Sequence, residues 1–206
     1  GSEMCIRDRL GYKHLGFLGG MSVPAVTRFG YGYVQGVDEA AKELGITSDV
    51  ELEYVCGGQF YGDADITAYM DTWYGSKGVE VVFACGGGIY TSAAEAAAKV
   101  DGKVIGVDSD QSPLAPETIL TSALKRVDNA CYDATKKTIL GTLEGGVETY
   151  DLAAGGVDIA QTTDNLSKDV LEKIEDAKKD IIAGDLVVPK NQEEFEEKYG
   201  DVYELD

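Results

Sequence analysis

Residues 14–24 have the sequence HLGFLGGMSVP, which predicts a buried strand, a glycine turn and the start of a helix. The apolar run 14–18 is typical of a strand that is covered on both faces. Pro24 follows the turn, and the first turn of a helix tolerates proline because the N–H that proline lacks would have no partner there. Leu44 and Gly45 would end the helix. This unit predicts an α/β fold.

The same alternation of apolar runs and longer amphipathic stretches continues along the chain. Further strands are predicted at residues 50–55, 79–85, 103–107, 119–123, 148–152 and 157–160, and further helices at 64–74, 92–100, 127–140 and 167–183. This rhythm implies a parallel sheet with helices on both faces, a three-layer αβα fold. The acidic tail from residue 192 is interpreted as a solvated helix face that Phe195 and Tyr199 hold against the body.

Length and charge narrow the possible partners. The 206 residues suit one sizeable α/β domain, or one domain and part of another. Lys and Arg number 18 against 37 Asp and Glu, a net charge of −19 that repels nucleic-acid backbones and anionic membrane surfaces. No run approaches the roughly 18 to 20 apolar residues of a membrane span.

Residues 1–9 are charged and aperiodic, and we interpret them as a non-native leader or assembly scar.

Cysteine and histidine usage gives no sign of metal or catalytic chemistry. Cys5, Cys56, Cys85 and Cys131 lack CxxC spacing, and His14 is the only histidine. Neither a zinc site nor a Cys-His catalytic pair is therefore expected. Cys85 and Cys131 are interpreted as small buried hydrophobic residues. We predict no catalytic residue, no metal and no cofactor.

The ligand site is expected where the strands end, because open parallel sheets bind ligands beyond the carboxyl ends of their strands. The loops after the second, third and fourth predicted strands supply the aromatic pair Phe60 and Tyr61, bare backbone at 86–88, and the carboxylates Asp108 and Asp110. This combination suits a flat ligand that carries hydroxyl groups.

Other interpretations of these residues remain open. The glycines fit neither GxxxxGK[ST] nor GxGxxG, and nearby carboxylates disfavour a bound phosphate. Asp108 and Asp110 would need further partners to act as an acid–base pair or as cation ligands, and they also suit turn and cap chemistry. Taken alone, Phe60 is more typical of loop packing than of a ligand platform, and Lys125 is more typical of a solvated charge.

Taken together, the ordered motifs resemble the basic membrane protein (BMP, or PnrA-like) family of solute-binding lipoproteins, which serve ABC importers of purine nucleosides. The resemblance covers residues 10 to about 190. It rests on LGFLGGM at 15–21, RF at 28–29 with Gly32, GQFYGD at 58–63, ACGGG at 84–88, VIGVDSDQ at 104–111 and TSALKRV at 121–127.

The resemblance implies a type I periplasmic-binding-protein fold, in which two lobes close on the ligand. Residues 10–122 would form the second lobe, and 123–206 the hinge crossovers and a C-terminal segment shared between the lobes. Family members also carry a first lobe and a lipidated cysteine, and this chain begins where the second lobe starts. The expected location is extracytoplasmic, with a lipid anchor on the full-length protein, and the expected partner is an ABC permease.

The family's ligand contacts carry over residue by residue. By this resemblance, Phe60 would be the second of two aromatic walls that enclose the base, and Gly86 would be a backbone contact to the ligand. Asp108 would be the carboxylate that binds the ribose hydroxyls, and Lys125 would be a polar contact near the hinge. Weaker candidates are Tyr61, Gly87, Asp110 and Gln111. With one wall of the site missing, this chain is expected to bind nucleosides weakly and to expose apolar surface between residues 127 and 160.

Two other classes of function are weighed against a binding protein. A nucleoside- or sugar-processing enzyme is disfavoured because His14 starts a strand, away from the three loops, and no nucleophile–base pair is visible. The effector domain of a transcription regulator would share the fold, but it would carry a basic DNA-binding segment at one end, and none is present. The identity of the nucleoside and the oligomeric state stay open.

Overall fold

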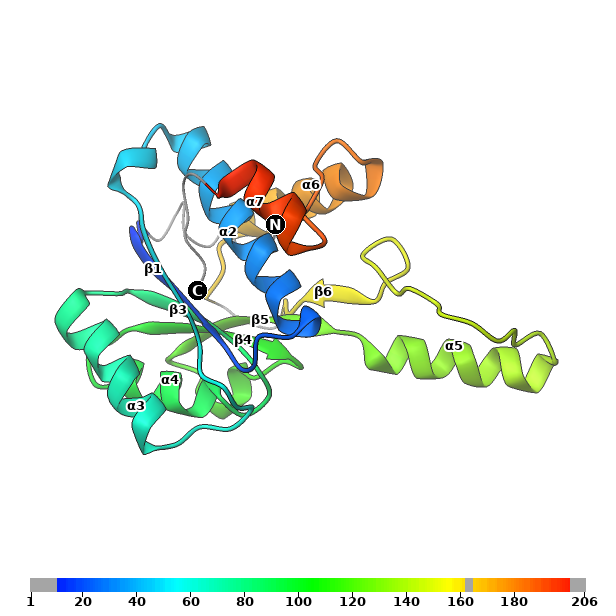
Figure 1. Ribbon diagram of the computed structural model, residues 1–206, viewed down its shortest axis with the longest axis horizontal. Helices are drawn as coiled ribbons and strands as arrows, with labels where there is room; N and C mark the ends of the chain where they lie inside the picture. The colour runs from blue at the N-terminus through cyan, green and yellow to red at the C-terminus, as the bar shows by residue number, and fades with distance from the viewer. Residues whose placement is uncertain (1–10, 162–164, 201–206) are drawn as a thin grey trace.

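The computed structural model describes residues 11–161 and 165–200 and contains a six-stranded sheet in the order β2-β1-β3-β4-β5-β6 (Figure 1). The leader at 1–9 and Cys5 lie outside the described residues. Strands β1 to β5 are parallel, and β6 pairs antiparallel with β5. The strands are β1 His14–Gly19, β2 Glu51–Cys56, β3 Val81–Cys85, β4 Lys103–Asp108, β5 Ile119–Lys125 and β6 Val157–Ile159.

Helices cover both faces of the sheet. The pair α3 and α4 lies on one face, and α2 and α6 lie on the other (Figure 1). The predicted three-layer αβα fold is therefore confirmed. The helices are α2 Pro24–Leu44, α3 Ala64–Asp71, α4 Tyr90–Ala98, α5 Val127–Leu140, α6 Lys168–Ala183 and α7 Gln192–Tyr199, with short helical turns at Thr47–Asp49, Thr72–Lys77 and Ser112–Leu114.

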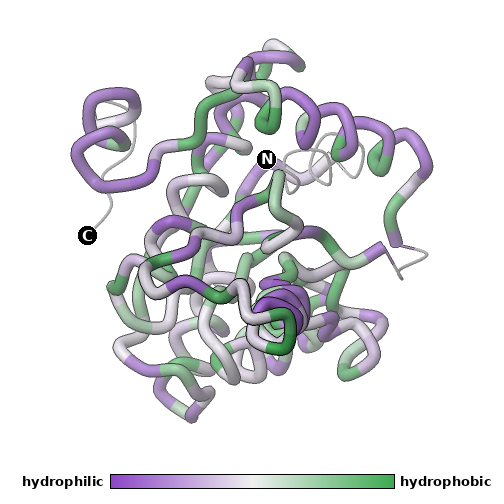
Figure 2. The backbone as a smooth tube through the Cα atoms, turned by 90° about the vertical axis from the view of Figure 1, so that its right-hand side faces the viewer, coloured by the Kyte–Doolittle hydropathy of each residue, from purple (hydrophilic) through white to green (hydrophobic). Residues whose placement is uncertain are grey.

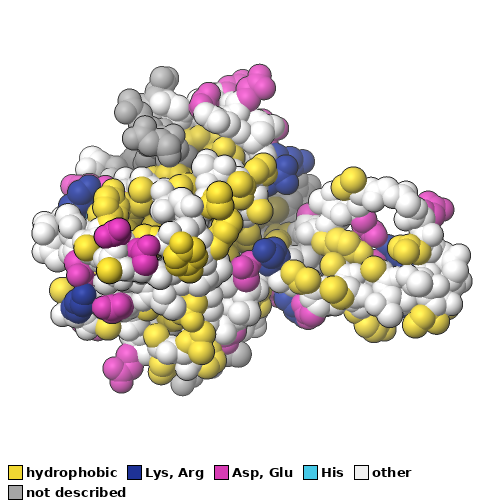
Figure 3. Space-filling view, turned by 60° about the horizontal axis from the view of Figure 1, so that its bottom comes forward, with side chains coloured by type: hydrophobic (Ala, Val, Ile, Leu, Met, Phe, Trp, Pro, Cys, Tyr) yellow, Lys and Arg dark blue, Asp and Glu magenta, His cyan; other side chains and the backbone are white. Residues whose placement is uncertain are grey.

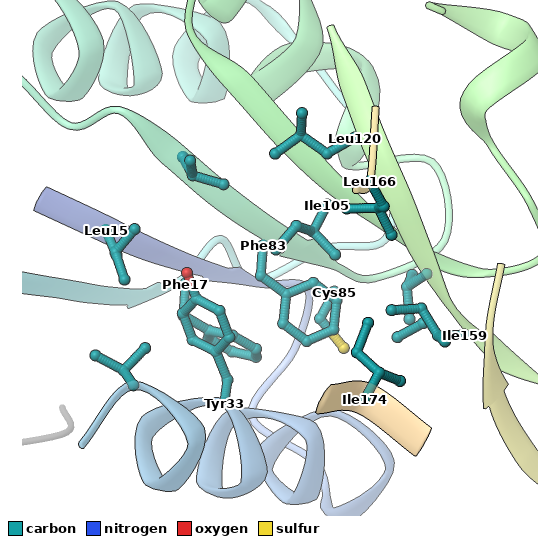
Figure 4. Close-up of a cluster of buried hydrophobic side chains, with 14 of the residues drawn as sticks. Leu15, Phe17, Tyr33, Phe83, Cys85, Ile105, Leu120, Ile159, Leu166 and Ile174 are labelled. Atoms are coloured by element: carbon teal, nitrogen blue, oxygen red, sulfur yellow. The ribbon is translucent and has the colours of Figure 1, made fainter. Parts of the chain in front are cut away.

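The sheet's two faces pack into two apolar clusters because successive strand residues point to opposite sides. Phe17 of β1 joins the cluster under α2 and α6, whereas its neighbour Leu18 joins the cluster over α3 and α4. Phe17 stacks on Tyr54 with ring centroids 4.6 Å apart and meets Phe83 edge-on at 5.5 Å. Figure 4 shows the Phe83 ring beside Cys85, whose predicted burial is confirmed. This core fixes the strand ends that carry the loops.

Helix α5 and the segment 141–156 that returns to β6 form an arm outside this core, which we call the α5 arm. None of the residues of α5 is buried, and Figure 1 shows the helix leading away from the sheet. In Figure 2 it points toward the viewer and carries both hydrophilic and hydrophobic residues. Exposed apolar side chains on the arm are Val127, Tyr132, Ile139, Leu140, Leu143 and Val147, and Figure 3 shows hydrophobic surface there.

The α5 arm overturns two predictions. Cys131 is exposed rather than buried because it lies on this uncovered helix. Residues 148–152 form no strand, because their partners lie on the arm itself and not in the sheet. The Tyr150 hydroxyl donates to Asp133 at 2.8 Å, which raises the pKa of Tyr150 to about 12, and Glu148 pairs with Lys137. A local alternation of side chains therefore did not indicate a strand here.

The acidic tail packs as predicted. Helix α7 presents Phe195 and Tyr199 to the body, and both side chains are buried. The ring of Phe195 stacks on Tyr31 of α2 with centroids 4.9 Å apart. The remaining residues of α7 are exposed and mostly charged, which is typical of a solvated helix face.

Candidate functional site

The loops that follow β1, β2 and β3 are joined by backbone hydrogen bonds beyond the carboxyl ends of the strands. The Gly20 N–H donates to the carbonyl of Cys85, and the Gly58 N–H donates to the carbonyl of Gly20, each at 2.8 Å. The Gly88 N–H donates to the carbonyl of Phe60, also at 2.8 Å. These bonds hold three loops, far apart in sequence, as one surface. We call this surface, with Asp108 and Lys125 at the ends of β4 and β5, the carboxyl edge.

Phe60 lies at the carboxyl edge with 43% of its area exposed. Its backbone is held by the bond from Gly88, and the next residue, Tyr61, forms a parallel bridge with Gly88. Gln59 donates through Nε2 to the Asp63 carboxylate at 2.7 Å, and Asp63 also caps α3. The cap, together with the bond from Gln59, lowers the pKa of the Asp63 carboxyl. An apolar ring on a fixed backbone is suited to stack on a flat ligand.

The glycine run after β3 divides into a buried and an exposed part. Gly86 is buried, and a Cβ placed on it would lie 2.7 Å from the backbone N and Cα of Gly20. Gly87 is exposed, with φ +53°, a conformation that favours glycine. The family resemblance implied Gly86 as the backbone contact, but Gly87 has the more accessible backbone.

Asp108 and Lys125 meet at the carboxyl edge. Lys125 Nζ lies 2.8 Å from Asp108 Oδ1, and both side chains are partly exposed. Asp108 has φ +67°, a left-handed conformation that is uncommon outside glycine and that concentrates at functional sites. The sheet brings the two residues together because β4 and β5 are neighbours, with Asp108 in register with Leu124. The two residues predicted as ligand contacts, Asp108 and Lys125, therefore lie side by side at the carboxyl edge.

The weaker candidates Asp110 and Gln111 form bonds inside the fold. Asp110 Oδ1 accepts from the backbone N–H of Ser112 at 3.0 Å and from its hydroxyl at 2.6 Å. Gln111 is buried, its Oε1 accepts from the Val107 N–H, and its own N–H donates to Ser122 Oγ. These bonds anchor the turn that follows β4. Asp110 and Gln111 therefore stabilise the turn next to Asp108 and do not add ligand-facing groups to the carboxyl edge.

Sequence reasoning assigned no role to a groove beside Lys125. The groove has a volume of about 480 Å³, and Arg28 and Phe29 of α2 form one of its walls. Arg28 donates through Nε to the carbonyl of Lys190 at 3.0 Å, which connects α2 to the C-terminal segment. The RF motif at 28–29 was the available signal, but its position on a helix gave no indication of a groove. The other lining residues are Pro24, Ala25, Lys125, Arg126, Val127, Ala130, Tyr150, Gly156 and Val157.

His14 lies at the start of β1, at the opposite end of the strand from the carboxyl edge, as predicted. Its ring nitrogens lie 3.7 Å from Glu51 and 3.6 Å from Glu53.

Within residues 11–161 and 165–200, no cluster of three or more His, Cys, Asp or Glu side chains is arranged to hold a metal ion. Over the same residues, no helix is long and apolar enough to cross a membrane.

A family model described as "ABC transporter substrate-binding protein PnrA-like" matches residues 12–192. The chain belongs to this family, called Bmp. The ABC transporter nucleoside-binding protein BmpA of Lactococcus lactis is 34% identical over 193 residues, covering 85% of this chain and 52% of BmpA. Basic membrane protein B of Borreliella afzelii is 33% identical over 187 residues, covering 88% of this chain and 51% of that protein. The chain therefore spans about half the length of these curated relatives.

Solved structures confirm the fold of this Bmp-family chain. A solute-binding protein of an ABC transporter system from Aeropyrum pernix superposes with a TM-score of 0.75 at 25% identity, over 95% of this chain and 64% of that one. A transcriptional activator of the comK gene from Bacillus halodurans gives 0.72 at 24% identity, over 91% and 62%, and shows the fold alone. Bmp proteins are substrate-binding proteins and not enzymes, in agreement with the sequence prediction.

Proposed function

We propose that this chain forms part of the extracytoplasmic solute-binding protein of an ABC importer and contributes one wall of a purine nucleoside site at the carboxyl edge. The observation that carries the proposal is the placement of the exposed ring of Phe60 and the Asp108–Lys125 ion pair along the same edge. Family membership supplies the class of protein, and the name of the Lactococcus lactis relative supplies the class of ligand.

Each part of a nucleoside has a suitable group at the carboxyl edge. The base would stack on Phe60, a contact that suits any purine because every base has a π-face. The ribose hydroxyls would donate to Asp108, and hydrogen bonds to a charged acceptor are about twice as strong as neutral ones. Lys125, whose Nζ is already 2.8 Å from Asp108, would donate to a polar atom of the sugar or base. The exposed backbone at Gly87 adds a further polar surface.

The division of the chain into lobes is part of the proposal. Residues 10–122 would be one lobe, and 123–206 would contain the crossovers and the segment shared with a second lobe. The α5 arm supports this division, because α5 has no buried residue and the arm exposes several large apolar side chains. Burial of such a surface in the complete protein would remove an unfavourable contact with water. The permease partner and a lipid anchor on the complete protein also belong to the proposal.

A thermal-shift screen tests the proposed function. The sample is the chain extended to the length of its curated relatives, with purine nucleosides, pyrimidine nucleosides, free bases and free sugars as ligands. A nucleoside present at 100 times its dissociation constant stabilises the folded state by about 2.7 kcal/mol. We expect purine nucleosides to raise the melting temperature more than bases or sugars. If no nucleoside raises it, the proposal is wrong.

A further inference from the structure

Gly20 lies against the ring of Phe60. An ideal Cβ placed on Gly20 would be 3.0 Å from the carbonyl oxygen of Gln59, and only 2.5 Å from Cδ1 and 2.7 Å from Cε1 of that ring. Both distances to the ring are far below ordinary van der Waals contact between carbon atoms. Gly20 is not among the glycines with positive φ, so its backbone conformation is open to other residues. Space for the ring, and not the backbone conformation, is what requires glycine at this position.

The ring is the part of this contact that would have to move. The backbone of Phe60 is fixed by the bond from Gly88, whereas the residue is 43% exposed, so its ring is free to move toward solvent. Gly86 provides the contrast, since the two shortest contacts of a Cβ there would be to backbone atoms of Gly20, at 2.7 Å, which have no comparable freedom. A methyl group at position 20 would therefore push the Phe60 ring, which makes the two shortest contacts, into another orientation.

We infer that Gly20 is a positioning residue for the aromatic platform: its missing side chain lets Phe60 lie against the turn after β1 and fixes the plane that the ring offers to a ligand. Gly20 acts through Phe60 and needs no contact with the ligand itself. The inference rests on the proposed function for its consequence in binding, but the orientation of the ring can be measured without any ligand.

Fluorine NMR measures the orientation of the ring in the extended protein labelled with 4-fluorophenylalanine. Phe60→Leu assigns the signal of Phe60 among those of the other phenylalanines. We expect Gly20→Ala to shift this signal, while the matched control Gly75→Ala, where a Cβ meets no atom within 4 Å, leaves it in place. An unshifted Phe60 signal in Gly20→Ala would overturn the inference, whatever the protein binds.

Calorimetric titration with inosine then tests the consequence for binding. Phe60→Ala should weaken binding roughly ten- to a hundredfold, as is typical for the loss of one base–aromatic stack. Gly20→Ala should weaken it by a similar factor, and the double variant no further than Phe60→Ala alone. Wild-type affinity in Gly20→Ala, or losses that multiply in the double variant, would show that Gly20 does not act through Phe60. Failure of the wild-type protein to bind inosine would contradict the proposed function, while the NMR result would still decide whether Gly20 sets the ring.

Discussion

Lys125 Nζ lies 2.8 Å from Asp108 Oδ1, which joins the last residue of β5 to the last residue of β4. Both side chains are partly exposed, so the pair adds only about 0 to 1 kcal/mol to folding stability. A weak pair is easily rearranged, and a ligand hydroxyl can share the Asp108 carboxylate with Lys125. Asp108 also has a left-handed backbone conformation, with φ +67°, of the kind that concentrates at functional sites.

Substitution of Asp108 should weaken nucleoside binding. We expect Asp108→Ala to lose about 1.5 to 3 kcal/mol of binding free energy, because hydrogen bonds to a charged group are lost. Asp108→Asn removes the charge but keeps the backbone conformation, because asparagine also tolerates left-handed φ. This variant should therefore lose most of the same binding free energy. Asp110→Asn is the matched control. Titration with adenosine and 2′-deoxyadenosine measures the effect, and an unchanged adenosine affinity in both Asp108 variants would reassign this carboxylate to turn structure.

Phe60 should tolerate aromatic replacements and no others. Phe60→Ala should cost about 1 to 3 kcal/mol of binding, whereas Phe60→Tyr and Phe60→Trp should cost little, because each keeps a ring for stacking. Tyr61→Ala is the control, since Tyr61 is the adjacent exposed aromatic. Calorimetry with a purine nucleoside compares the four variants. Equal binding by all the Phe60 variants, with a loss in Tyr61→Ala, would move the platform to Tyr61.

Gly86→Ala should destabilise the fold itself. Its Cβ would lie 2.7 Å from two backbone atoms of Gly20, and overpacking of this kind costs about 1 to 3 kcal/mol. Gly75→Ala, with open space around the new methyl group, should stay near wild type. The measurement is the free energy of unfolding from urea denaturation. Wild-type stability in Gly86→Ala would mean that the turns after β1 and β3 are not in close contact.

The α5 arm should make this 206-residue chain self-associate. It exposes Ile139 at 80% and Leu140 at 64% of their area, and exposed apolar patches favour contacts between molecules. We expect the double variant Ile139→Ser, Leu140→Ser to be less associated than wild type in sedimentation velocity. The chain extended to the length of its relatives should be less associated too. A wild-type chain that sediments as a monomer at all concentrations would contradict this account of the arm.

Most of the fold follows from sequence patterns, because a strand buried on both faces is a continuous apolar run. This holds for residues 15–18 and 81–85, and the predicted bounds 14–18 and 79–85 lie within two residues of β1 and β3. The patterns failed at 148–152 and at Cys131, since local alternation does not tell whether a partner element is present to cover it. Both lie on the α5 arm, where packing inside this chain is sparse.

The candidate site was predicted less completely than the fold. The strand-end rule located Phe60 and Asp108, but contacts between neighbouring strands depend on sheet order. The pairing of Asp108 with Lys125 requires β4 next to β5, and no local pattern gives that order. The inward position of Gln111 depends on the absence of a Cβ at Gly106, which would lie 2.5 Å from Gln111 Oε1. Close contacts of this kind, between residues of different strands and turns, cannot be predicted from a local sequence pattern.

Calorimetric titration of one purine nucleoside into two proteins tests the central claim most directly, namely that the carboxyl edge is one wall of a nucleoside site. The proteins are this chain and the chain extended to the length of its curated relatives. If this chain lacks one stacking partner and two or three hydrogen bonds, its affinity should be about 3 to 4 kcal/mol weaker, a several-hundredfold difference. The extended protein should bind, and its Phe60→Ala, Asp108→Ala double variant should not. Equal affinity in the two proteins, or full binding by the double variant, would contradict the account.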